Sequence, residues 1–165
     1  MKNIIAQPAA GNPLDLAEEF VAAHNWAFNR SDDDELLVEV QGHWTDYQLY
    51  FLWRPELGAL YFSLSFDCKI PVAKKTQAYE LLGRINEKLW LGHFDLINND
   101  HTLLYRHTLL IRGMNGLTIE QLEDLVDSAV AETERFYPAL QYFIWGGRSP
   151  EAALEAALFE TVGDA

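Results

Sequence analysis

The sequence predicts an α+β domain with an antiparallel sheet of about five strands and flanking helices. Short stretches alternate apolar and polar residues, turn residues separate them at hairpin spacing, and segments of helical periodicity stand between the groups of strands. The expected order is helix, three strands, helix, two strands and helix, with a short C-terminal helix at the end. Residues 26–30 are a candidate further strand, joined to the next by the acidic turn 31–34.

The first helix begins after residues 1–11, which show no periodicity and are expected to form a flexible leader ahead of a single domain at 12–165. Asn12 can cap this helix, and Pro13 occupies a position where its missing N–H costs nothing. Its apolar stripe is Leu14, Ala17, Phe20, Val21 and His24.

Three strands are expected at 36–41, 46–54 and 60–68, and their apolar residues fix a register. A four-residue loop at 55–58 pairs apolar residues with apolar residues, namely Trp53 with Leu60, Phe51 with Phe62, Leu49 with Leu64, and Tyr47 with Phe66. A two-residue turn at Gly42-His43 would pair Val38 with Tyr47 and Leu36 with Leu49.

The second half of the chain reads as helix, hairpin and two helices. A helix is expected from Ile70 to about Leu91, with Gly92 as its stop, and a hairpin of 93–98 and 101–112 turns at 99–100. A capping box at 118–121 opens the third helix, which Pro138 should kink and which ends near Trp145. The last helix starts at Ser149-Pro150, and residues 162–165 are expected to fray.

The composition excludes several classes of partner. The chain has 25 acidic and 12 basic residues, a net charge of −13, which argues against nucleic-acid binding and against docking on an anionic membrane. Neither a signal peptide nor a membrane span is expected, and the single cysteine rules out an internal disulfide. We therefore expect a cytoplasmic protein.

His93, Asp95 and His107 are the candidate residues for a metal-dependent or acid–base enzyme. The expected hairpin sets His93 opposite Arg106 on the same face as Asp95, and it turns His107 to the other face. One ion could then contact both histidines only with a bulge in a strand. Cys68 falls on the core face of its strand and is expected to be a buried thiol. No catalytic, cofactor-binding or metal-binding residue is predicted, while the enzyme stays an alternative.

Two surfaces are more apolar than folding requires. Tyr79, Gly83, Asn86 and Trp90 are expected on one flank of the middle helix, and a glycine inside a helix is often kept for close approach. On the polar face of the sheet lie Tyr50, Leu52 and Tyr61, together with Leu104 and Leu110. The helix flank is the predicted homodimer interface. The sheet residues contact a protein partner, unless the third or the last helix covers them.

The negative charge is concentrated near the C-terminus. Residues 118–165 contain ten acidic and two basic side chains, a local charge of −8. This asymmetry keeps a further alternative open, in which the protein is an acidic decoy that occupies the basic surface of a nucleic-acid-binding protein.

Several short motifs stand out, namely residues 81–86 (LLGRIN), 91–94 (LGHF), Tyr105-Arg106 and the ending 143–153 (FIWGGRSPEAA). Together they resemble the YbjN family of bacterial sensory transduction regulators. The resemblance implies a fold similar to type III secretion chaperones, which are small acidic cytoplasmic homodimers that hold unfolded client segments. It carries over no catalytic residue and no cofactor. The expected function is a non-enzymatic protein-binding module that acts as a homodimer on an unidentified protein partner.

Overall fold

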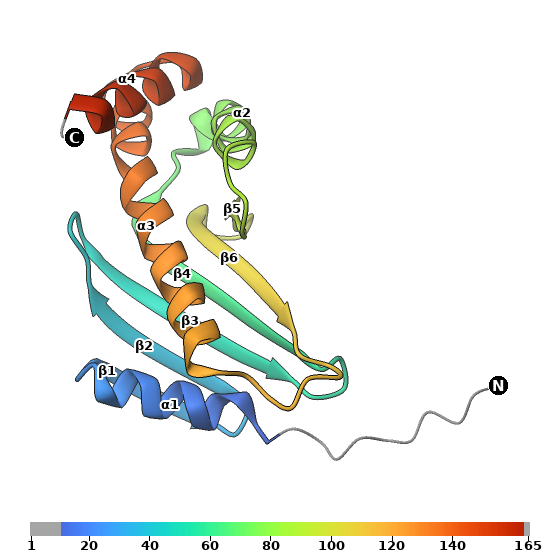
Figure 1. Ribbon diagram of the computed structural model, residues 1–165. Helices are drawn as coiled ribbons and strands as arrows, with labels where there is room; N and C mark the ends of the chain where they lie inside the picture. Colours follow the sequence, from blue (N-terminus) through green and yellow to red (C-terminus); the bar gives the residue numbers. More distant parts are fainter. Residues whose placement is uncertain (1–10, 164–165) are drawn as a thin grey trace.

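The computed structural model describes residues 11–163, which form one six-stranded antiparallel sheet and four α-helices (Figure 1). The sheet order is β1-β2-β3-β4-β6-β5. The elements are α1 (Pro13–Ala23), β1 (Ala27–Asp32), β2 (Glu35–Gln41), β3 (Asp46–Arg54), β4 (Ala59–Lys69), α2 (Lys75–Asn86), β5 (His93–Leu96), β6 (Thr102–Leu110), α3 (Ile119–Ile144) and α4 (Pro150–Gly163). The α+β class is confirmed, and the sixth strand is the candidate at 26–30. Residues 1–10 of the expected leader lie outside the described residues.

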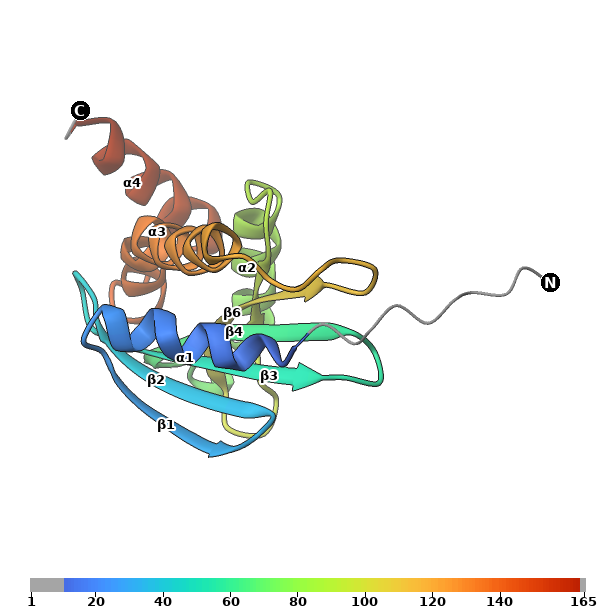
Figure 2. The same cartoon turned by 60° about the horizontal axis from the view of Figure 1, so that its bottom comes forward.

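The helices gather on one side of the sheet, as Figure 2 shows from the edge of the first strands. We call the covered side the inner face and the other side the outer face. Strand side chains alternate between the two faces, so every second residue of β2, β3 and β4 is buried under the helices. The inner face and the helices share one hydrophobic core, whose largest fully buried side chains include Tyr47, Phe51, Phe62, Tyr105, Phe136 and Phe143.

The register between β3 and β4 is the predicted one, with all four expected pairs in place. The register predicted between β2 and β3 is wrong by two residues. In the structure, Val38 pairs with Leu49 and Leu36 pairs with Phe51. Tyr47 faces Val40, and the loop spans residues 42–45, closed by a hydrogen bond from the Gly42 N–H to the Thr45 carbonyl (3.0 Å). A shift by two keeps each side chain on its face, so the alternation could not reveal the error.

The β2–β3 loop is held by the middle of α3. The Trp44 indole N–H donates to the Glu134 carbonyl (3.2 Å), and the ring stacks on Tyr137 at 5.9 Å between centroids. In an α-helix, the carbonyl of Glu134 would accept from residue 138, but this residue is a proline without an N–H. Trp44 therefore supplies the donor that Pro138 lacks, and α3 continues through Pro138 as a helix to Ile144.

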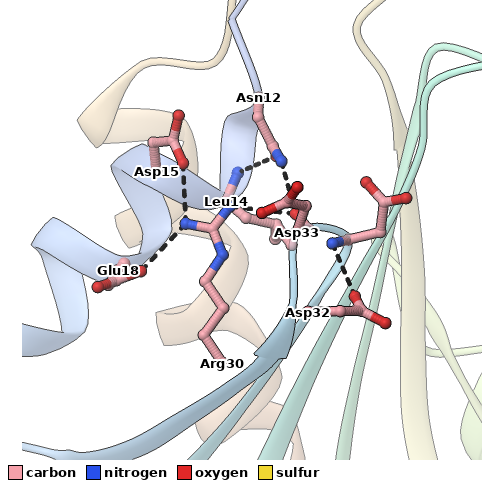
Figure 3. A network of polar contacts seen from close by, with 8 residues as sticks. Asn12, Leu14, Asp15, Glu18, Arg30, Asp32 and Asp33 are labelled. Atoms are coloured by element: carbon pink, nitrogen blue, oxygen red, sulfur yellow. Dashed lines mark hydrogen bonds and ion pairs between the residues drawn. The ribbon is translucent and has the colours of Figure 1, made fainter.

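Helix α1 is tied to β1 by an arginine that bridges several oxygens (Figure 3). The Arg30 guanidinium contacts Asp15 at 2.8 Å and Glu18 at 3.0 Å, and it donates to the Asp33 carbonyl at 3.1 Å. The pKa of Arg30 is raised, chiefly by the hydrogen bonds to these carboxylates. Asn12, the cap of α1, also donates to the Asp33 carbonyl (2.6 Å). The acidic turn thus fastens α1 to the sheet.

Several boundaries differ from the expectation. Helix α2 covers only Lys75–Asn86, after a 3₁₀ turn at Val72–Lys74, instead of 70–91, and the second hairpin is shorter, at 93–96 and 102–110. Helix α3 has the predicted capping box. At the C-terminal end of α3, the carbonyls of Phe143 and Ile144 accept hydrogen bonds from the Lys74 ammonium group (2.7 and 2.8 Å). Helix α4 extends to Gly163, so 162–163 are helical, while 164–165 lie outside the described residues.

Candidate protein-interaction surface

The outer face carries an apolar patch over its central strands. The register sets Leu37 of β2 opposite Tyr50 of β3, and Leu52 of β3 opposite Tyr61 of β4. We call these four residues the outer apolar patch. The rings of Tyr50 and Tyr61 meet edge to face, with 6.4 Å between their centroids. Leu37 is 38% exposed, and the other three are half-buried. No helix among residues 11–163 lies on this face in Figures 1 and 2.

The sequence predicted three of these residues and missed Leu37. The alternation placed Leu37 on the polar side of its strand, but the wrong β2–β3 register set it two residues away from Tyr50. Tyr50 lies in a partly apolar setting, because burial is the main cause that raises the pKa of its hydroxyl. A hydrogen bond to Glu35 and the charge of that carboxylate raise it further. Leu110 is exposed, as expected for this face, whereas Leu104 is buried between its neighbours Ser65 and Asp95.

A hollow of about 930 Å³ adjoins the outer apolar patch. It occupies the end of the outer face where β2 and β3 meet their loop, and we call it the acidic hollow. Its charged lining residues are Glu39, Asp46, Asp67 and Lys69. Three carboxylates therefore stand against one ammonium group, so the hollow has a negative potential.

Helix α2 ends at Asn86, so the predicted dimer residues do not all lie on the helix. Tyr79 and Gly83 lie exposed on the helix, and a Cβ atom added to Gly83 would meet nothing within 4 Å. Asn86 makes hydrogen bonds within the chain. Its side-chain amide donates to the Phe94 carbonyl (3.0 Å) and accepts from the Phe94 N–H (2.8 Å). Trp90 lies beyond the helix, contrary to the expectation, and is 99% exposed.

The three candidate residues His93, Asp95 and His107 do not all line one hollow. His93 and Asp95 face Arg106 as predicted: Arg106 donates to His93 at 3.0 Å and pairs with Asp95 at 2.8 Å. His107 borders the same hollow of about 460 Å³ as His93, but Asp95 is not among the residues that line it. Burial lowers the pKa of His107, and the charge of His93 lowers it further. Among residues 11–163, no group of three metal-ligating side chains converges.

Cys68 is a buried thiol, as the strand pattern predicted. Burial raises its pKa to about 12, and the charge of Asp67 adds to this effect. The thiolate, which is the reactive form, is therefore disfavoured at neutral pH.

Comparison with known proteins decides the family. The model of the YbjN family, described as "Putative bacterial sensory transduction regulator", matches residues 13–142. The chain belongs to the YbjN family. Among solved structures, it is similar to "YbjN, a putative transcription regulator from E. coli", with a TM-score of 0.53 and 14% identity over 89% of this chain and 93% of that chain. This likeness supports the fold. A search of curated proteins gave no match.

The family assignment confirms the resemblance seen in the sequence motifs. It supports a regulatory or binding role, while the likeness to type III secretion chaperones stays a prediction. None of the helices in the described part of the chain combines the length and the apolarity that crossing a bilayer requires.

Proposed function

We propose that this YbjN-family chain is a non-enzymatic protein-binding regulator that acts as a homodimer in the cytoplasm and holds a protein partner on the outer apolar patch. The observation that carries the proposal is an uncovered sheet face with two tyrosines and two leucines side by side. Such a cluster stays in contact with water in the isolated chain, and covering it stabilises a complex. Tyrosine is also enriched at the centres of protein interfaces.

The experiment compares the wild type with Tyr50→Ala/Tyr61→Ala. Proteins captured from a lysate are identified and purified, and their affinities are then measured with both forms. We expect the double variant to weaken binding by at least about tenfold, because aromatic residues in interface centres each contribute roughly 1–2 kcal/mol or more. Phe159→Ala is the matched control, since it removes an exposed aromatic from α4 on the other side of the sheet. Equal affinities of the wild type and the double variant would contradict the proposal.

The homodimer is proposed to form through Tyr79, Gly83 and Trp90, with Asn86 at the rim. The open space beside Gly83 supports close approach of a second chain. Gly83→Arg should convert the dimer into a monomer in size-exclusion chromatography with light scattering, because the long side chain fills the approach surface. Gly83→Ala is the control, which adds one methyl group and should remain a dimer. A monomeric wild type at all accessible concentrations would reject this part of the proposal.

A further inference from the structure

The outer face has two chemically different halves, and their order follows the strands. Along β3, the residues that face outward run from Asp46 through Gln48 to Tyr50, Leu52 and Arg54. On β3, negative charge stands at one end, apolar surface in the middle and one positive charge at the other end. The neighbouring strands also carry a carboxylate toward the Asp46 end, because Glu39 follows Leu37 on β2 and Asp67 lies on the same face of β4 as Tyr61. At the Arg54 end, Glu35 of β2 lies opposite Leu52.

The distances between these halves follow from strand geometry. Residues two apart on a strand are separated by about 7 Å, so Asp46 lies roughly 14 Å from Tyr50 along β3. An extended segment that lies along the strands has the same repeat. Its side chains over the outer apolar patch and over the acidic hollow are therefore about two to four residues apart.

We infer that the outer face binds an extended segment of a protein partner with apolar side chains in one half and Lys or Arg in the other half. The inference rests on the proposed function and adds the chemistry of the partner. Three carboxylates against one lysine in the acidic hollow favour a basic half, and the four residues of the patch favour an apolar half.

The test uses synthetic peptides of about eight residues, the length that spans the face from Arg54 to Asp46 in extended form. The first peptide carries Leu and Phe at alternate positions of one half, Lys at alternate positions of the other half, and Ser between them. The second peptide has Glu in place of Lys. Fluorescence anisotropy measures the dissociation constant of each labelled peptide for the purified full chain.

We expect the Lys peptide to bind at least about tenfold more tightly than the Glu peptide, because complementary charges meet in the hollow. Raising the salt from about 0.1 M to about 1 M should weaken the Lys peptide several-fold, since the Debye length falls from about 10 Å to about 3 Å. Tyr50→Ala/Tyr61→Ala should abolish the binding.

The variant Glu39→Gln/Asp46→Asn/Asp67→Asn should weaken the Lys peptide about tenfold, by loss of several surface ion pairs. Its matched control is Glu123→Gln/Asp124→Asn/Asp127→Asn, which removes the same charge from the exposed side of α3 and should change the affinity less than twofold. Equal weakening by both variants would mean general attraction to an acidic protein and would overturn the inference. Absent binding of the Lys peptide to the wild type would overturn it as well.

The two proposals fail in different ways. A partner whose affinity depends on Tyr50 and Tyr61 but not on Glu39, Asp46 and Asp67 would overturn only the inference about the basic half. A partner insensitive to Tyr50→Ala/Tyr61→Ala would overturn the proposed function itself.

Discussion

The two faces of the sheet are built from alternate residues of the same strands, yet they have different surroundings. Phe51 and Phe62 face the helices and are completely buried, whereas Tyr50 and Tyr61 next to them face outward and stay half-buried. Folding accounts for the inner face, because its side chains make up the core. The apolar side chains of the outer apolar patch lose less contact with water on folding than those of the core, and this difference is the reason to look for a partner there.

The largest expected effect is the loss of stability when a side chain of the inner face is shortened, compared with the same change on the outer face. Phe62→Ala should lower the free energy of unfolding by about 3–5 kcal/mol, because it leaves a cavity in a closed core. Tyr61→Ala should lower it by no more than about 1 kcal/mol, because water already reaches this side chain. Urea denaturation of both variants gives the comparison. Similar losses at the two sites would mean that the outer face is part of the folding core.

Alkaline pH should act on the inner face more than on the outer face. Burial, followed by the charge of Glu134, raises the pKa of Tyr47 to about 12 from an ordinary value near 10. The unfolded chain then loses the Tyr47 proton first. The contribution of this group to stability is therefore present below about pH 10 and is lost between about pH 10 and 12, by up to roughly 2–3 kcal/mol.

Tyr47→Phe should reduce this slope of stability against pH, measured by urea denaturation at several alkaline pH values. Tyr50→Phe is the control on the outer face, where the tyrosine is half-buried instead of completely buried. A slope that Tyr47→Phe leaves unchanged would contradict the assignment. Some slope should remain in either variant, because the buried Cys68 thiol loses its proton first in the unfolded chain as well.

The contact between Trp44 and α3 is expected to have an intermediate effect. Trp44→Phe keeps a ring beside Tyr137 but removes the indole N–H, so the Glu134 carbonyl loses its donor at a cost of about 1–2 kcal/mol. Pro138→Ala supplies a helical N–H for the same carbonyl, and Trp44→Phe should then cost less in the Pro138→Ala background. Trp90→Phe is the control, at a fully exposed position. Additive effects of Trp44→Phe and Pro138→Ala would contradict the shared role.

The smallest effect is expected at the polar group of the outer face. Arg106→Gln removes the ion pair with Asp95, but both side chains are about 40% exposed. Such pairs contribute about 0–1 kcal/mol, and salt reduces this further. Urea denaturation at low and high salt should therefore give nearly the same stability for the wild type and the variant. A loss above about 2 kcal/mol would indicate a structural role that the exposed pair does not explain.

The sequence predicted the fold where local chemistry decides it. The alternation gave both faces of the central strands, and the loop at 55–58 gave the β3–β4 register, because Pro55 and Gly58 suit a four-residue turn. The β2–β3 loop could not be predicted in the same way. Its length depends on Trp44 and His43 meeting Glu134, which is about 90 residues away in the sequence.

The candidate site was predictable only in part, for the same reason. Tyr50, Leu52 and Tyr61 share a face by simple alternation, but whether a helix covers them depends on how α3 and α4 pack. Trp90 was expected on the flank of α2 because the periodicity continues to Leu91. The helix ends earlier, where Asn86 bonds to Phe94 of a strand that the local sequence does not place beside it.

The bonds between Asn86 and Phe94 also limit how copies of this chain can associate through their sheets. The amide of Asn86 occupies one N–H and one carbonyl of the β5 edge, as a neighbouring strand would. The other edge, β1, has no strand beside it among residues 11–163, and its pairing with β2 is irregular between Asn29 and Asp32. One edge is thus partly occupied and the other is irregular, and both features disfavour strand-to-strand addition of further copies. Both features act at the edges of the sheet, so they disfavour growth into fibres without covering the outer face.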